Sequence, residues 1–501
     1  MQEAFSELLT YYQTIYDLGK AAAVLNWDRE TYMPRGGTRA RADQLSTLAR
    51  LIHERVTSPK MGELLEKVLP WAREQGEDSF EYGVVRLLKR RYDRQVKVPA
   101  DLVEAMSRAA SKGHETWLLA RKEKNFAPFA PALEELVRLR KDYADALGWE
   151  ERRYDALLDQ VEPGITSRWL DQFFAELREG LVPLVQAVSE RRDRVKDDVL
   201  HQHWPEDKQW QLTLQAVEAI GYDLSRGRQD RSVHPFTTAF SPDDVRITTR
   251  VDEHFFSAAF FASLHEAGHA LYGQGIPQKF YRTPLDGGSS GGVHESQSRM
   301  WENVVGRSLA FWEFFFPKLK EMFPSQTEGV TVEDWYRAVN KSQPSLIRVE
   351  ADELTYNLHI MVRYELEQDL FADRLQVKDL PEAWNEKMKS YLGITPPDDL
   401  EGVLQDIHWS GGGFGSFPSY ALGNVIAGQI WETVKEAQPG IEEEMRRGLF
   451  GTLLQWTREK IHRHGAQYDP LDLVQRATGK PLSTEPYLSY IRQKFSHLYG
   501  L

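Results

Sequence analysis

The sequence predicts a mainly α-helical protein. Apolar residues recur at helical spacing along most of the chain, and charged residues occupy the opposite faces. Only one stretch alternates as β-strands do. Hydrophobic residues make up 41% of the 501 residues and charged residues 27%, a balance typical of a folded chain that can bury a large core.

The first part of the chain is expected to consist of helices. Amphipathic spacing predicts them at residues 3–26, 37–56, 80–95, 100–122, 128–147 and 167–196. The segment 197–205 carries a charge run and a proline, so it is the best candidate for a linker. We therefore expect one unit over residues 1–501, with a possible division into 1–196 and 206–501.

A basic cluster, Lys89-Arg90-Arg91-Tyr92-Asp93-Arg94, lies in one of these helices. In isolation such a cluster resembles a nucleic-acid patch, but apolar neighbours at helical spacing favour a solvated helix face. The net charge of −13 also disfavours non-specific binding to nucleic acid.

Residues 236–240 and 245–251 read as two strands around the turn 241–244. They directly precede an apolar helical run. An edge strand at this place could bind an extended peptide, and the alternative is a small sheet that merely braces the helix.

The apolar helical run contains the pattern His-Glu-x-x-His. Residues four apart lie on one face of a helix, so His265 and His269 can bind one metal ion, and Glu266 beside them can act as a general base. A pair of core histidines is the structural alternative. Burying two imidazoles and a carboxylate is costly unless they are paired or bound to metal. Gly273 and Gly275 supply stop signals for this helix.

A third protein ligand is needed. The class of metalloproteases with a third histidine six residues further on is excluded, because Tyr272 and Gly275 occupy its glycine and histidine positions. Glu295 is the best candidate, since the Gly-rich loop 286–292 leads into a new helix near Val293. Glu302 lies further along that helix. It is a candidate for orienting a ligand histidine, and the alternative is that it is a solvated glutamate on the helix face.

Further helices are expected at 297–323 and 350–375, and a Gly-rich loop at 409–420. The glycines of this loop match neither a dinucleotide fingerprint nor a P-loop, so we interpret it as a mobile, substrate-facing loop. A second histidine pair, His201-x-His203, is interpreted as exposed loop residues because no carboxylate motif accompanies it.

Several short motifs now give the chain a family resemblance. It resembles the carboxypeptidase Taq family of metallocarboxypeptidases, and the resemblance covers nearly the whole chain. Besides the metal helix, the motifs are the opening segment Trp27 to Pro34, HPF at 234–236, DxRxT at 244–248, His294-Glu295-Ser296-Gln297, IRxxAD at 347–352 and GxxQDxHW at 402–409.

The resemblance implies a large helical, bundle-like metallopeptidase with a deep substrate groove and a small sheet beside the His-Glu-x-x-His helix. It also implies zinc, a broad-specificity carboxypeptidase activity on peptides with a free C-terminus, a cytoplasmic location and a homodimer. Cobalt or manganese can occupy the same ligands.

Candidates for the remaining roles lie in or beside the motifs. Tyr420 and His408 are the expected donors to the oxyanion. Arg348, which Asp352 could orient, is the first choice for binding the C-terminal carboxylate, because arginine binds carboxylates bidentately. Arg246 is the second choice, and His234 of the HPF motif is a further substrate-binding candidate. An ion pair with Asp352 or Glu350 is the structural alternative for Arg348.

Two other functions stay open: an endo-acting oligopeptidase on the same scaffold, and a helical binding protein with a relic metal site. The intact Glu266 disfavours the relic.

With no cysteine, the chain cannot use disulfides or thiolate ligands, and a reducing compartment is natural. The first residues lack the basic and apolar regions of a signal peptide, and no apolar run reaches the about 18–20 residues that span a membrane.

Overall fold

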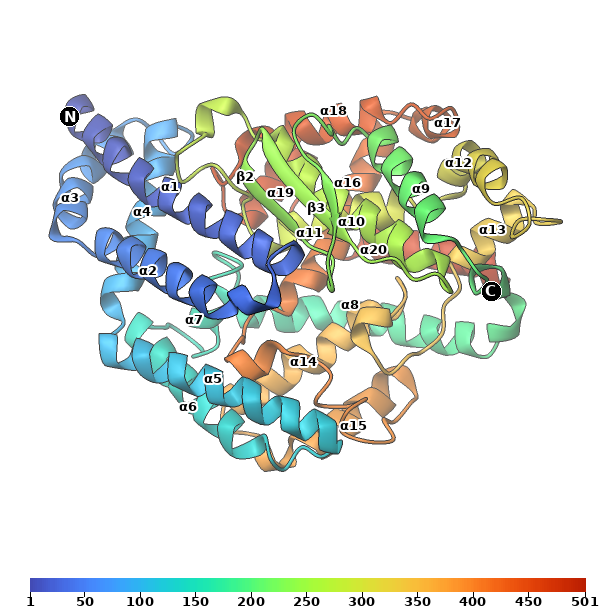
Figure 1. Cartoon of the computed structure of the whole chain (residues 1–501), viewed down its shortest axis with the longest axis horizontal. Coiled ribbons are helices and arrows are strands. Elements are labelled where there is room, and N and C mark those ends of the chain that lie inside the picture. Colours follow the sequence, from blue (N-terminus) through green and yellow to red (C-terminus); the bar gives the residue numbers. More distant parts are fainter.

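The computed structural model describes residues 1–501 and confirms the predicted fold class: helices hold 68% of the residues and strands 3%. The predicted N-terminal helices are present, with one more between them. They are α1 (Gln2–Thr31), α2 (Thr38–Val56), α3 (Pro59–Glu74), α4 (Phe80–Lys97), α5 (Ala100–Glu123) and α6 (Ala130–Leu147). Figure 1 shows α1 to α4 at one end of the molecule and α5 and α6 along one edge.

The short α7 (Asp155–Leu158) and the long α8 (Ser167–Ser189) follow, and α9 (Glu206–Ala219) precedes the sheet. The helix predicted over 167–196 is therefore too long. It ends at Ser189, and short 3-10 turns at Arg192–Arg194 and Asp198–Leu200 lead on to α9.

One three-stranded sheet contains β1 (Gln229–Arg231), β2 (Thr237–Ser241) and β3 (Asp244–Thr249), in the order β1-β3-β2. The hairpin of β2 and β3 confirms the two predicted strands, and β1 pairs with β3 in parallel. The sequence did not indicate β1, since its three residues are all polar. Both β2 and β3 pack on α10 (Phe256–Gly275), the helix that carries the two histidines (Figure 1).

The helix predicted over 297–323 is interrupted. α11 (Gly291–Arg299) widens into a π-helix over Met300–Val305, and α12 (Leu309–Met322) begins anew after Ser308, whose hydroxyl accepts the backbone N–H of Phe311. The helix predicted over 350–375 is shorter, because the Asp352 carboxylate accepts the backbone N–H groups of Leu354 and Thr355 ahead of α14 (Tyr356–Phe371).

The remaining helices complete the core. They are α13 (Val332–Val339), α15 (Leu380–Leu392), α16 (Pro418–Ala437), α17 (Ile441–Arg446), α18 (Gly451–Lys460), α19 (Pro470–Thr478) and α20 (Glu485–Tyr499). Because α16 begins at Pro418, the predicted loop 409–420 ends earlier than expected, and Tyr420 lies in the first turn of a helix.

The buried apolar residues form two main clusters. The larger contains 100 residues between Trp117 and Tyr499 and surrounds α10, α11 and α16. The second contains 18 residues and joins α1 to α4 with the segment that follows α10. No helix has the length and apolar character needed to cross a bilayer. The division near 197–205 stays a prediction.

Candidate metal centre and substrate site

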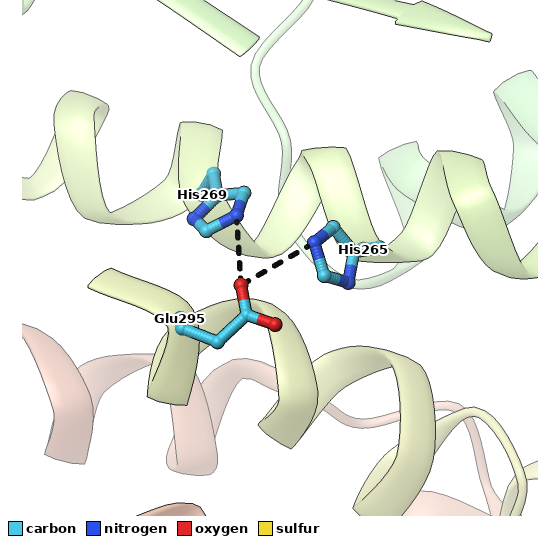
Figure 2. A group of neighbouring side chains, drawn as sticks. All are labelled: His265, His269 and Glu295. Carbon is cyan, nitrogen blue, oxygen red and sulfur yellow. Dashed lines mark ion pairs between the residues drawn. The ribbon is translucent and has the colours of Figure 1, made fainter. Parts of the chain in front are cut away.

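The predicted metal ligands converge. His265 and His269 lie one turn apart on α10, and Glu295 projects toward both from α11 (Figure 2). The Glu295 Oε2 atom lies 3.6 Å from His265 Nε2 and 3.5 Å from His269 Nε2. One donor atom from each of the three side chains lies within 4.8 Å of the others, so a single ion between them can contact all three.

Two glycines allow these helices to approach closely enough. A Cβ atom at Gly268 would lie 2.6 Å from the backbone oxygen of Gln297 on α11. A Cβ atom at Gly423 of α16 would lie 2.4 Å from Cγ of Glu295. Either contact would force a backbone or a ligand to move. The ligand geometry therefore depends on helix packing, which motif spacing did not indicate.

The other ring nitrogen of each candidate ligand histidine has a partner. His265 Nδ1 lies 2.8 Å from Glu302 Oε2, which is the contact proposed for Glu302. His269 Nδ1 lies 2.6 Å from Nδ1 of His294, a partner that sequence reasoning missed although His294 stands beside Glu295 in its motif. These contacts fix the ring orientation, and they leave both Nε2 atoms facing Glu295.

Arg299 keeps the two carboxylates charged. It donates to Glu295 Oε1 at 2.7 Å and to Glu302 Oε2 at 3.1 Å. Burial alone would raise the pKa of both groups, but Arg299 and His265 hold the pKa of Glu295 well below its usual range and lower that of Glu302 to about 2. Burial and the neighbouring His269 lower the pKa of His294 to about 3, so this ring is neutral.

Glu266 lies on the same helix but does not join the ligand cluster. Its carboxylate is buried, and Oε2 accepts the hydroxyl proton of Thr237 at 2.6 Å, from strand β2. β2 is an edge strand, and Lys20 of α1 covers part of that edge by donating to the backbone oxygen of Ala239. Nothing in the sequence pointed to Thr237. Peptide binding along β2 stays a prediction.

We expect Glu302→Gln to weaken metal affinity about 10- to 100-fold, because the amide lacks the charge that supports His265. A competition titration against a chelator of known affinity measures the change. Glu313→Gln, which removes an exposed carboxylate paired with Arg446, is the matched control and should leave the affinity as it is. Unchanged affinity in Glu302→Gln would refute this role for Glu302.

A second polar cluster surrounds Arg348. This side chain is only 7% exposed. It contacts Asp406 Oδ1 through Nε at 2.9 Å and Nη2 at 2.8 Å, and donates to the Tyr356 hydroxyl at 2.9 Å. Arg363 holds the other oxygen of Asp406 at 2.5 Å. The two guanidinium groups overcome the effect of burial and keep the pKa of Asp406 well below its usual range.

The expected pairing of Arg348 with Asp352 is wrong. Asp352 instead accepts the Ser342 hydroxyl at 2.8 Å and backbone N–H groups, so it shapes the loop ahead of α14. Glu350 does not pair with Arg348 either, since Asp406 takes the guanidinium. Asp406 belongs to the GxxQDxHW motif. The sequence did not predict its contact with Arg348, because no local spacing relates the two residues.

Tyr420 and His408 lie beside this cluster and beside each other. His408 Nε2 is 3.4 Å from the Tyr420 hydroxyl, and the Arg348 guanidinium lies 5.3 Å from the Tyr420 ring centre. Burial lowers the pKa of His408 to about 4 and raises that of Tyr420 to about 12, so the imidazole is neutral and the phenol keeps its proton at neutral pH.

The structure does not bring Arg246 and His234 into either cluster. Arg246 of β3 binds both oxygens of Asp244, and its guanidinium lies 4.5 Å from the Trp27 ring centre. His234 is exposed in the loop between β1 and β2, where its backbone oxygen accepts the Ser232 hydroxyl.

Known proteins match the chain over its full length. The family model for carboxypeptidase Taq (M32) metallopeptidases matches residues 7–495. Thermostable carboxypeptidase 1 of Thermus thermophilus is 44% identical over 100% of this chain and 99% of its own length. Carboxypeptidase 1 of Bacillus subtilis is 41% identical over 99% of this chain and 100% of its own length.

The fold matches as well. The crystal structure of an M32 carboxypeptidase from Deinococcus radiodurans R1 superimposes with a TM-score of 0.96 at 40% identity, covering 100% of both chains. The structure of Pyrococcus furiosus carboxypeptidase gives a TM-score of 0.94 at 36% identity, over 99% of both chains. The chain therefore belongs to the carboxypeptidase Taq (M32) family, and it is a metallocarboxypeptidase, a hydrolase of peptides.

Proposed function

We propose that this enzyme removes amino acids one at a time from the free C-terminus of peptides, with broad specificity and one zinc ion per chain. The convergence of His265, His269 and Glu295 carries the proposal. Two imidazoles and one carboxylate form a donor set that zinc favours in catalytic sites with one open position, and cobalt or manganese can also occupy it. A cation there supplies Lewis-acid activation of water and of the scissile carbonyl.

Glu266 is the proposed general base. Its carboxylate accepts a proton from the attacking water and then delivers it to the leaving amine. The Thr237 hydroxyl, 2.6 Å from Glu266 Oε2, holds the carboxylate in one orientation. The other oxygen of Glu266 has no hydrogen-bond donor on the protein, so it is available to water.

Tyr420 and His408 are the proposed donors to the negative charge that develops on the carbonyl oxygen. The pKa of about 12 keeps the Tyr420 hydroxyl protonated at neutral pH, as a donor must be. Because His408 is neutral, one of its nitrogens carries a proton and the other accepts. Its Nδ1 is buried and has no hydrogen-bond partner in the fold, although Asp406 lies 4.0 Å away.

Arg348 is the proposed ligand of the substrate's C-terminal carboxylate, with Arg246 and His234 as further substrate-binding residues. Asp406 and Tyr356 fix the Arg348 guanidinium beside Tyr420. A fixed fork of N–H donors binds a carboxylate with little loss of side-chain entropy. Since Arg363 shares the charge of Asp406, the cluster retains positive charge for an incoming anion.

One assay tests the proposal. A short unblocked peptide is incubated with the enzyme, and released amino acids are measured with and without a chelator. We expect stepwise release from the C-terminus, loss of activity with chelator and recovery when zinc is added back. The same peptide with an amidated C-terminus is the control and should be cleaved far more slowly. Internal cleavage of the amide at an equal rate would indicate an endo-acting oligopeptidase instead.

The resemblance to the family also leads us to propose a homodimer and a cytoplasmic location. Sedimentation equilibrium measures the first, and fractionation of the native host measures the second. A monomer at micromolar concentration, or the protein in an extracytoplasmic fraction, would contradict the corresponding proposal.

A further inference from the structure

A cavity of about 650 Å³ lies between the N-terminal helices and the loops of the metal centre. Four arginines and one histidine line it, and no aspartate or glutamate does. The chain as a whole carries a net charge of −13, so this local excess of positive charge runs against its composition. A cavity with one sign of charge concentrates ligands of the opposite sign.

The arginines come partly from the basic cluster that the sequence analysis assigned to a solvated helix face. Arg90, Arg91 and Arg94 of α4 line this cavity, and their side chains are only partly exposed. Arg90 pairs at 3.1 Å with Asp469, which also pairs with Arg86, and Arg94 pairs with Asp159. These two arginines therefore have partners within the fold.

Arg91 and Arg140 differ from them in having no carboxylate partner, although Arg91 lies against the Tyr12 hydroxyl, which also lines the cavity. No carboxylate oxygen lies within the 4.0 Å of an ion pair from either guanidinium, although both side chains are half-buried. Burial lowers the pKa of Arg140, whose guanidinium lies over the ring of Tyr143. A half-buried guanidinium without an anion is costly, and a bound carboxylate would remove that cost by charge-assisted hydrogen bonds.

The cavity adjoins the metal centre on one side and the loop that carries His408 on another. Gly288 and Ser289 line it, and they belong to the loop that leads into α11 and Glu295. A Cβ atom at Gly288 would lie 2.8 Å from the ring of His294, the partner of the ligand His269. On another side, Arg140 Nε would lie 3.1 Å from a Cβ atom at Gly412, in the loop that follows His408.

We propose that this cavity binds an acidic side chain of the peptide substrate, upstream of the scissile bond, through Arg91 and Arg140. The inference rests on the proposed function and specifies its substrates: peptides with a glutamate or aspartate at a fixed distance from the C-terminus. Arg348 serves the terminal carboxylate, and the two arginines of the cavity serve a second carboxylate in the same chain.

The test uses unblocked peptides in which one glutamine is replaced by glutamate at successive upstream positions. At one position we expect wild-type enzyme to prefer the glutamate peptide about tenfold in kcat/KM, as for other charge-complementary contacts. In the double variant Arg91→Gln/Arg140→Gln the ratio of the two kcat/KM values should fall to about one. The ratio is internal to each protein, so a general loss of activity does not affect it.

The matched control is Arg50→Gln/Arg138→Gln, which also removes two positive charges. These arginines are exposed on α2 and α6 and pair with Glu54 and Asp142 within their own helices. The control should keep the preference of the wild type. If the control loses the preference for the glutamate peptide as fully as the double variant does, the preference depends on net charge alone, and the proposal is overturned.

Inorganic sulfate distinguishes a peptide side chain from a free anion. We expect sulfate to raise KM for the glutamate peptide more than for the glutamine peptide. If sulfate stabilises the protein while every position gives equal kcat/KM, the cavity serves a free anion and the proposal is overturned. Equal cleavage of both peptides overturns only this inference, whereas failure to release any C-terminal residue overturns the proposed function.

Discussion

Glu266→Gln is expected to lower kcat by about 10²- to 10⁴-fold, the range that a positioned general base contributes. Gln has nearly the shape of Glu, and its amide oxygen can still accept the Thr237 hydroxyl. None of the three proposed metal ligands changes, so the amount of metal bound per chain should stay as in the wild type. Steady-state kinetics on a free-acid peptide and metal analysis of the same sample measure both quantities.

Glu253→Gln is a suitable control, because Glu253 is exposed just before the same helix. Two outcomes would contradict the assignment. Undiminished turnover with zinc bound would mean that another group takes the proton. Loss of zinc in Glu266→Gln would mean that Glu266 supports the metal centre rather than the proton transfer.

Arg348→Ala should raise KM and lower kcat/KM about 10²-fold for peptides with a free C-terminus, and much less for the matching amides. The estimate follows from the loss of a charge-assisted contact to a carboxylate in a partly desolvated site. The fold should tolerate the change, because Arg363 still pairs with Asp406 at 2.5 Å. Paired kinetics on free-acid and amidated peptides measure the selectivity.

Arg374→Ala is the control, because it removes an exposed arginine that pairs with Asp369. It should leave kcat/KM unchanged for both the free-acid and the amidated peptides. An equal loss on free-acid and amidated peptides in Arg348→Ala would overturn the assignment. Arg348 would then serve to hold Asp406 and Tyr356 in place, which its buried contacts also allow.

The sequence predicted the convergence of His265, His269 and Glu295 because its signals are local. Two histidines four apart must share a face of any helix, and a glutamate that follows a Gly-rich loop starts the next helix nearby. The helical class was predictable for the same reason, since amphipathic spacing is read over short windows. Contacts between distant segments were not predictable. Asp406 was missed as the partner of Arg348 because no periodicity joins two separate loops.

The predicted helix boundaries were wrong where side chains or a change in backbone hydrogen bonding interrupt or start a helix. The π-helix after Arg299 and the hydroxyl of Ser308 divide one predicted helix into two, and a proline at the first position of α16 turns part of a predicted loop into helix. Amphipathic spacing placed the arginines of α4 on a polar face, but it does not tell an open surface from the lining of a cavity.

The packing of α16 against Glu295 has a consequence for synthesis. The chain is synthesised from its N-terminus. His265, His269 and Glu295 therefore leave the ribosome well before Gly423 and α16, the helix that packs against Glu295. We expect nascent chains to bind the metal ion poorly until α16 has folded onto α11. The hydrolase would then gain activity only near the end of translation, and unfinished copies would be harmless to neighbouring peptides.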